Sequence, residues 1–99
     1  MNKKEVITLT SSGDSSNIGW AGGKGSIQFS GTFSSKTIKI QASIDDVNYV
    51  TLSNYMVRNG VSTDDIAITA NTIVPIDIGR CRLRFNASGA MTGVKVYIS

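Results

Sequence analysis

The chain has no histidine and only one cysteine, Cys81, in its 99 residues. A serine or cysteine nucleophile needs a neighbouring base, and a structural zinc ion needs several cysteine or histidine ligands. Both kinds of site are therefore disfavoured, and we expect no enzymatic activity, no cofactor and no bound metal. A lone cysteine cannot form an intrachain disulfide, so we expect Cys81 to behave as a small apolar residue.

Long apolar runs and dense charge are also missing. No apolar run approaches the roughly 18 residues that a membrane-spanning helix needs, and no signal peptide opens the chain. We therefore expect a protein that is made in a reducing cytoplasm and has no membrane partner. The formal net charge is only +3, whereas a nucleic-acid-binding domain usually carries a denser basic patch. Nucleic acid is the least favoured partner on this ground.

The segment from Arg80 to Ala87 shows what the chain does have, a strict alternation of apolar and polar residues. Cys81, Leu83, Phe85 and Ala87 share one face, and Arg80, Arg82, Arg84 and Asn86 share the other. Side chains alternate between the two faces of a strand, so this pattern predicts a half-buried strand. We call Arg80, Arg82 and Arg84 the arginine row and expect it to face outward.

Similar alternation recurs along the chain and predicts further strands, separated by turns rich in glycine, serine, asparagine and aspartate. The predicted strands cover residues 5–10, 26–33, 37–43, 49–52, 66–70, 72–78 and 94–98. Together with the arginine strand they give seven or eight strands in a single domain, residues 1–99. We predict an all-β fold, an antiparallel β-sandwich or small jelly roll.

Three local features predict details of the strands and their connections. The short link Ser34-Ser35-Lys36 predicts a hairpin between strands 26–33 and 37–43. Gly31 on an apolar face predicts a bulge or a close backbone approach, because glycine weakens a strand interior. Pro75 lacks a backbone N–H and predicts an edge position or a bulge.

The segment Asp45-Asp46-Val47-Asn48 predicts a turn, since aspartate and asparagine side chains bond to nearby backbone groups. Two adjacent carboxylates beside an asparagine also suggest a calcium site. The alternating ligand spacing of a calcium-binding loop is absent, however, so the turn is the favoured interpretation.

Trp20 lies in a glycine-rich stretch, residues 11–25, and has two interpretations. It is either a plug that closes one end of the sandwich or an exposed anchor at an interface, where tryptophan is enriched. Tyr97 is predicted to point outward from the last strand. With the arginine row, these two aromatic residues form the predicted interface set: Trp20, Arg80, Arg82, Arg84 and Tyr97.

The segment Gly25–Leu52 carries a resemblance. Its first strand reads Gly-Ser-Ile-Gln-Phe-Ser-Gly-Thr-Phe, and its second reads Lys-Thr-Ile-Lys-Ile-Gln-Ala-Ser before the aspartate turn. This pattern resembles small virion proteins of tailed bacteriophages. Galactose-binding-like sandwiches have a similar strand and turn, which leaves a carbohydrate-binding module as an alternative, with Trp20 or Tyr55 stacked on a sugar ring.

The resemblance implies a structural part of a phage particle that is made in the host bacterial cytoplasm. The first expectation is a capsid decoration (cement) protein that stabilises the shell; a neck, tail or fibre-attachment component is the alternative within the same class. The implied partners are the major capsid protein or other virion proteins. The implied assembly is a homo-oligomer, with a trimer favoured.

Overall fold

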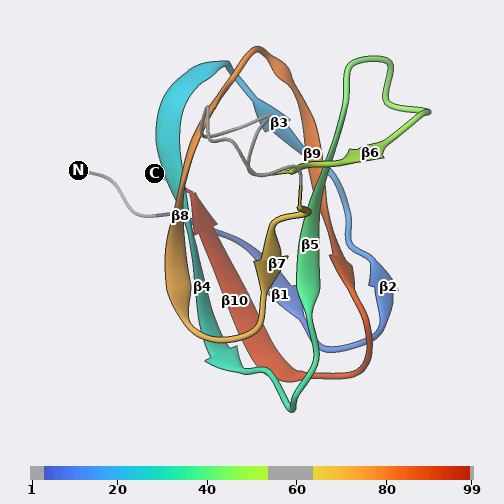
Figure 1. The fold of residues 1–99 in the computed structure, drawn as a ribbon, viewed down its shortest axis with the longest axis vertical. Helices are drawn as coiled ribbons and strands as arrows, with labels where there is room; N and C mark the ends of the chain where they lie inside the picture. The colour runs from blue at the N-terminus through green and yellow to red at the C-terminus, as the bar shows by residue number, and fades with distance from the viewer. Residues whose placement is uncertain (1–3, 54–63, 99) are drawn as a thin grey trace.

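The computed structural model describes residues 4–53 and 64–98, which form ten strands (Figure 1). The four longest strands are β4, β8, β9 and β10. The strands are β1 (Lys4–Leu9), β2 (Gly13–Asp14), β3 (Ile18–Trp20), β4 (Gly23–Thr32), β5 (Ile38–Ser43), β6 (Val50–Thr51), β7 (Ala67–Ile68), β8 (Thr72–Ile78), β9 (Cys81–Ala87) and β10 (Thr92–Ile98).

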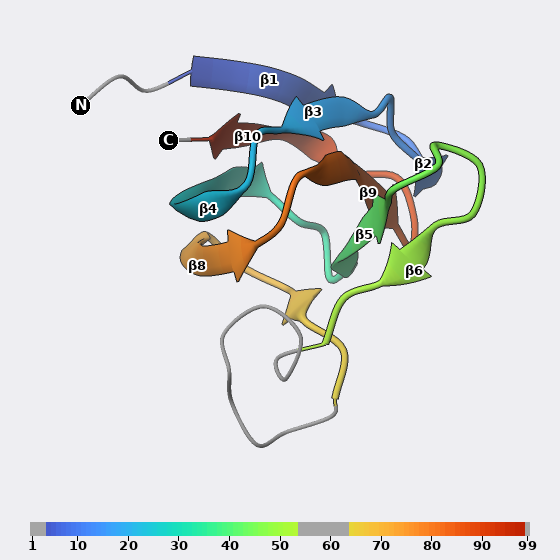
Figure 2. The same ribbon diagram turned by 90° about the horizontal axis from the view of Figure 1, so that it is seen from above.

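The strands form two antiparallel sheets. The four-stranded sheet has the order β1-β10-β4-β8, and the six-stranded sheet has the order β2-β9-β5-β6, with β3 also on β9 and β7 on β5. Figure 2 shows the first set of strands along one side of the molecule and β9, β5 and β6 along the other. The predicted all-β sandwich is confirmed. The strand count exceeds seven or eight because short strands such as β2 and β3 lie in the stretch predicted as turns.

The core lies between the two sheets and takes apolar residues from both. Phe29 of β4 meets Phe85 of β9 edge to face, with ring centroids 5.7 Å apart. Residues beside them, including Ile27, Leu83 and Val96, are fully buried. Along β9 the alternation is as predicted: Leu83, Phe85 and Ala87 are buried, and the intervening residues are exposed or half-buried.

The predicted hairpin at Ser34-Ser35-Lys36 is wrong. Ser34 and Ser35 do form a tight turn, in which both have positive φ and the Lys36 N–H donates to the Phe33 carbonyl at 2.9 Å. However, β4 pairs with β10 and β8, whereas β5 pairs with β9, so the turn carries the chain from one sheet to the other. The apolar faces of both strands meet across the core, and this packing outweighs direct pairing.

The expectations for Pro75 and Gly31 are confirmed. Pro75 lies on β8, which pairs only with β4 among the described strands and is therefore an edge strand. Gly31 has φ +149°, and a Cβ there would lie 2.8 Å from the Gly93 carbonyl oxygen and from Val94 Cα. The pairing of β4 with β10 shifts register between Thr92 and Lys95, opposite this close approach.

Replacing Gly31 with alanine should destabilise the fold by about 1–3 kcal/mol, through strained backbone and overpacking against β10. Urea denaturation measures this free energy of unfolding. Gly79→Ala is the matched control, because a Cβ at Gly79 meets nothing within 4 Å and its φ is not positive. Equal losses in the two variants would contradict the close approach at Gly31.

Candidate interaction surface

Arg84 is the most constrained member of the arginine row. Its Nε donates to Gln41 Oε1 at 2.6 Å, and its guanidinium lies 3.3 Å from an Asp14 carboxylate oxygen. The guanidinium carbon also lies 4.0 Å from the centre of the Tyr49 ring, a cation–π contact. Arg84 is therefore held by three groups of its own chain, Gln41, Asp14 and the Tyr49 ring.

Arg82 belongs to the same polar network on the outer face of the six-stranded sheet. Its guanidinium donates to Asn17 Oδ1 at 2.7 Å, and Asn17 Nδ2 donates to Asp46 Oδ1 at 2.9 Å. The Tyr49 hydroxyl donates to the same aspartate oxygen, and this hydrogen bond raises the pKa of Tyr49 above 10.0. Two of the three arginines in the row thus connect strand β9 to the Asp46 loop.

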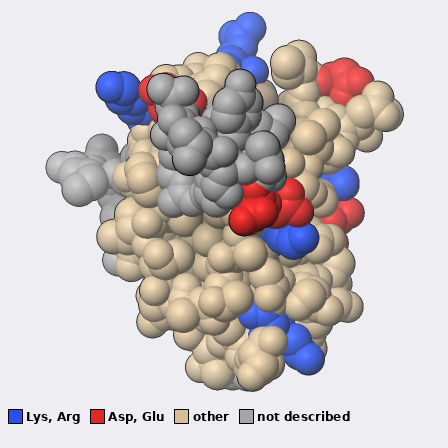
Figure 3. Space-filling view, in the orientation of Figure 1, with Lys and Arg blue, Asp and Glu red and all other residues tan. Residues whose placement is uncertain are grey.

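Arg80 differs from the other two arginines. It is exposed in the turn between β8 and β9, and it has no hydrogen-bond or ion-pair partner among the described residues. Its charge is therefore available to a partner. Figure 3 shows that Lys and Arg side chains on the viewed face lie in separate spots within a wide uncharged surface.

Trp20 is buried, with 6% of its surface exposed, and its indole N–H donates to the Ile78 carbonyl at 3.3 Å. The interpretation as an exposed anchor is wrong, because β3 pairs with β9 and places the ring in the core. Tyr97 is half-buried on β10, in the sheet opposite the arginine row. The predicted interface set is therefore not brought together on one surface, and its contacts with a partner stay a prediction.

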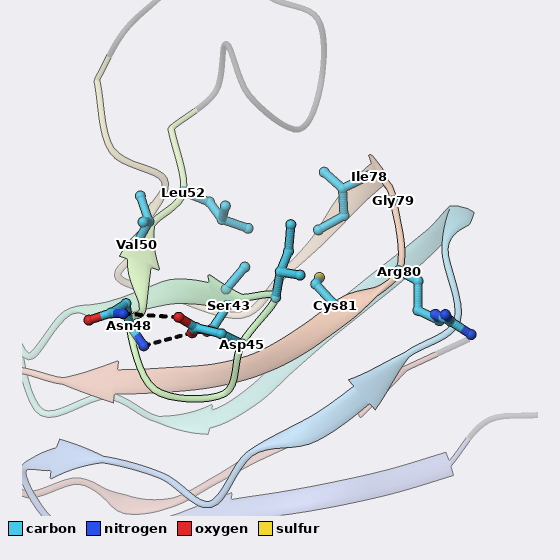
Figure 4. A pocket seen from close by; sticks show the side chains of 11 residues that line it. Ser43, Asp45, Asn48, Val50, Leu52, Ile78, Gly79, Arg80 and Cys81 are labelled. Atoms are coloured by element: carbon cyan, nitrogen blue, oxygen red, sulfur yellow. Dashed lines mark hydrogen bonds between the residues drawn. The ribbon is translucent and has the colours of Figure 1, made fainter.

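An apolar groove of about 620 Å³ opens beside the end of β5, and sequence reasoning missed it. Its walls come from β5, from the loop that leads to β6, and from the turn between β8 and β9 (Figure 4). The apolar lining consists of Ala42, Ile44, Val50, Leu52, Ile78 and Cys81. Cys81 is half-buried, and burial raises the pKa of its thiol, so the thiol is neutral and belongs to this apolar wall.

One rim of the groove displays apolar side chains to solvent. Ile44 is 91% exposed, Val47 77% and Val50 54%; they are three of the four large hydrophobic residues that are exposed in the described part of the chain. Grouped exposed apolar side chains mark interaction sites more often than scattered ones do. One feature of the sequence could have indicated this rim: Ile44 and Val47 are apolar residues within a segment whose polar residues predict an exposed turn.

The loop 44–49 is held by Asp45, as the turn prediction requires. Asp45 Oδ1 accepts hydrogen bonds from the Ser43 hydroxyl and from the backbone N–H groups of Val47 and Asn48, at 2.8–3.0 Å. Asn48 Nδ2 donates to Oδ2 at 2.9 Å. The two backbone donors, followed by the side-chain donors, hold the pKa of Asp45 well below its ordinary value of 3.8. The turn is confirmed, and no group of three metal-ligating residues occurs in the described ranges.

The two sides of the groove carry opposite charge. Asp45 lines the groove from the loop 44–49, whereas Asp46 of the same loop is not among the lining residues and accepts hydrogen bonds from Asn17 and Tyr49. Across the groove is Arg80, whose side chain extends outward from the rim in Figure 4.

The described residues also contain no helix that is long and apolar enough to cross a membrane. Comparison with known proteins finds no matching family model, no matching curated protein and no matching solved structure.

Replacing Asp45 with asparagine should lower the urea midpoint at neutral pH, because the loop loses a charged acceptor for four donors. Since the folded-state pKa of Asp45 is depressed, its stabilisation is complete above pH 3.8 and is lost as the pH falls further. The difference between wild type and variant should therefore be constant above about pH 5 and shrink as the pH falls through 3.8 and below. Asp77→Asn, at an exposed aspartate on β8, is the matched control. A pH-independent difference for Asp45→Asn would contradict this account.

Proposed function

We propose that this chain is a non-enzymatic structural protein of a tailed-phage virion, with capsid decoration as the first role. The observation that carries the proposal is the apolar groove with its exposed rim of Ile44, Val47 and Val50. Burial of apolar area is the main source of affinity between proteins. An apolar patch that is exposed in the isolated chain therefore marks a surface that a partner can cover.

The chemistry of the groove supports binding rather than catalysis. Asp45 has its carboxylate oxygens occupied by four donors that fix a turn, and Cys81 is a neutral thiol in an apolar wall. Arg80 is a permanent cation and does not exchange protons near neutral pH. General acid–base catalysis needs a group poised to transfer a proton, and these three residues do not supply one.

The competing binding functions have less support. Carbohydrate stacking needs an exposed aromatic face, and Trp20 is buried in the core, while Tyr55 lies outside the described residues. Nucleic-acid binding needs free cations, yet Arg84 is paired with Asp14, and Arg82 is tied through Asn17 to Asp46. A protein surface is therefore the favoured partner, and the resemblance of residues 25–52 to phage virion proteins favours the major capsid protein or another virion protein.

The direct test is the composition of purified particles. Particles isolated from a lysate of the natural source should contain the chain at a fixed copy ratio to the major shell protein, as measured by quantitative mass spectrometry. Particles that lose the chain, after deletion of its gene, should be less resistant to heat or chelation if the chain stabilises the shell. A chain found only in the soluble fraction would overturn the proposal.

The variant Arg82→Glu should keep the fold, because Arg82 is exposed and the variant loses one exposed hydrogen bond to Asn17, worth about 0.5–1.5 kcal/mol. It should weaken attachment to particles by roughly ten-fold, since it reverses a charge on the outer face of the six-stranded sheet. Co-sedimentation with particles that lack the chain measures the attachment. Lys95→Glu, an equal charge change on β10 of the other sheet, is the control. Unchanged attachment of Arg82→Glu would remove this residue from the contact surface.

A further inference from the structure

We propose that the apolar groove binds an extended segment of the partner protein in which a bulky apolar residue lies close in sequence to an acidic residue. The apolar side chain enters the groove, and the carboxylate pairs with Arg80 outside it. This inference gives the chemistry of the partner segment, and it rests on the protein-binding role that the proposed function assigns to the groove.

The sign of the partner's charge follows from the two charged residues, Asp45 and Arg80, among the described residues that line the groove. Asp45 already accepts hydrogen bonds from the Ser43 hydroxyl, from the Asn48 side chain and from two backbone N–H groups of its own loop. Arg80 has no hydrogen-bond or ion-pair partner among the described residues. A guanidinium group can donate two parallel hydrogen bonds to a carboxylate. The unused charge at the groove is therefore positive and fits an acidic partner.

The position of Arg80 determines where the acidic group lies. Arg80 stands in the turn that forms one wall, and its side chain extends outward from the rim (Figure 4). The groove itself is lined by apolar side chains such as Leu52 and Ile78. A carboxylate inside the groove would lose its water without gaining a partner, which is costly. The apolar side chain therefore belongs inside the groove and the carboxylate belongs beyond the turn.

The exposed rim favours an extended segment over a single inserted side chain. Ile44 and Val50 both line the groove, yet they are 91% and 54% exposed. A segment that runs from Arg80 across the groove to the loop 44–49 covers these side chains as well as the groove. The loop is ordered in advance by the hydrogen bonds to Asp45, so association costs less conformational entropy there.

The first experiment titrates the isolated chain with short peptides and follows the amide shifts by NMR. The probes are acetyl-Ser-Leu-Phe-Glu-Ser-amide and the same peptide with Gln or Lys in place of Glu. At low salt the Glu peptide should bind about five-fold more tightly than the Gln peptide, the upper range for an exposed ion pair. The Lys peptide should bind most weakly, because its cation is opposed to Arg80. Raising the salt concentration should reduce these differences.

Two variants test which residues of the chain are responsible. Arg80→Gln should remove the preference for the Glu peptide over the Gln peptide, whereas Lys95→Gln, at an exposed lysine of the other sheet, should keep it. Ile44→Ser should weaken binding of every peptide by about ten-fold, because less apolar area is buried. Ile73→Ser is the matched control, since Ile73 is 62% exposed on β8 and does not line the groove.

Cys81 provides an independent measure of whether the groove is covered. It lines the groove and is the only cysteine of the chain, so alkylation by iodoacetamide labels this site alone. The bound Glu peptide should slow the alkylation. On purified particles, Cys81 should also react more slowly than it does in the free chain.

Equal affinities for the peptides, or a preference for the Glu peptide that survives Arg80→Gln, would overturn the inference. A Cys81 thiol that reacts equally fast on particles and in the free chain would overturn it too. That outcome leaves the proposed function standing, because the chain would then attach through another surface. The proposed function fails separately, when purified particles lack the chain, and the peptide titration does not depend on particles.

Discussion

Phe29 and Phe85 meet edge to face between the two sheets, and the positions of the other surface features depend on this contact. It fixes which face of β9 points inward, because side chains along a strand alternate. Once Phe85 is inside, Arg82 and Arg84 must point out of the six-stranded sheet. The same contact places β4 in the opposite sheet from β5, since Ile38 and Ile40 of β5 bury their side chains against the same interior.

The alternation of the sequence was sufficient to predict the all-β sandwich and the inward face of β9. The edge position of Pro75 and the close approach at Gly31 were also predictable. Proline lacks a backbone N–H for a second neighbouring strand, and glycine on an apolar face leaves room for another backbone. The alternation could not predict which strands pair. The turn at Ser34 and Ser35 has the local geometry of a hairpin turn, yet the strands separate into different sheets. Pairing is a non-local property, and the packing of both apolar faces decides it.

The candidate surface was harder to predict than the fold. Arginine, tryptophan and tyrosine are enriched at interfaces, which is why Trp20 and the arginine row were expected there. In the structure, Trp20 fills the core, and Arg82 and Arg84 bind groups of their own chain. The enrichment of these residue types at interfaces does not say where a particular fold places each residue. Ile44 carried no such signal, and only the geometry of its loop shows it beside a groove.

The arginine row and the groove are linked through the loop 44–49. Arg84 lies over Tyr49, the Tyr49 hydroxyl donates to Asp46, and Asn17 connects Asp46 to Arg82. These contacts attach the loop to the six-stranded sheet, while Asp45 accepts hydrogen bonds from the backbone N–H groups of Val47 and Asn48 within the loop. A loop with so many internal hydrogen bonds does not need to fold its apolar side chains inward to become ordered. The polar network therefore permits Ile44 and Val47 to stay exposed, because Arg82 and Arg84 help to position the loop that carries them.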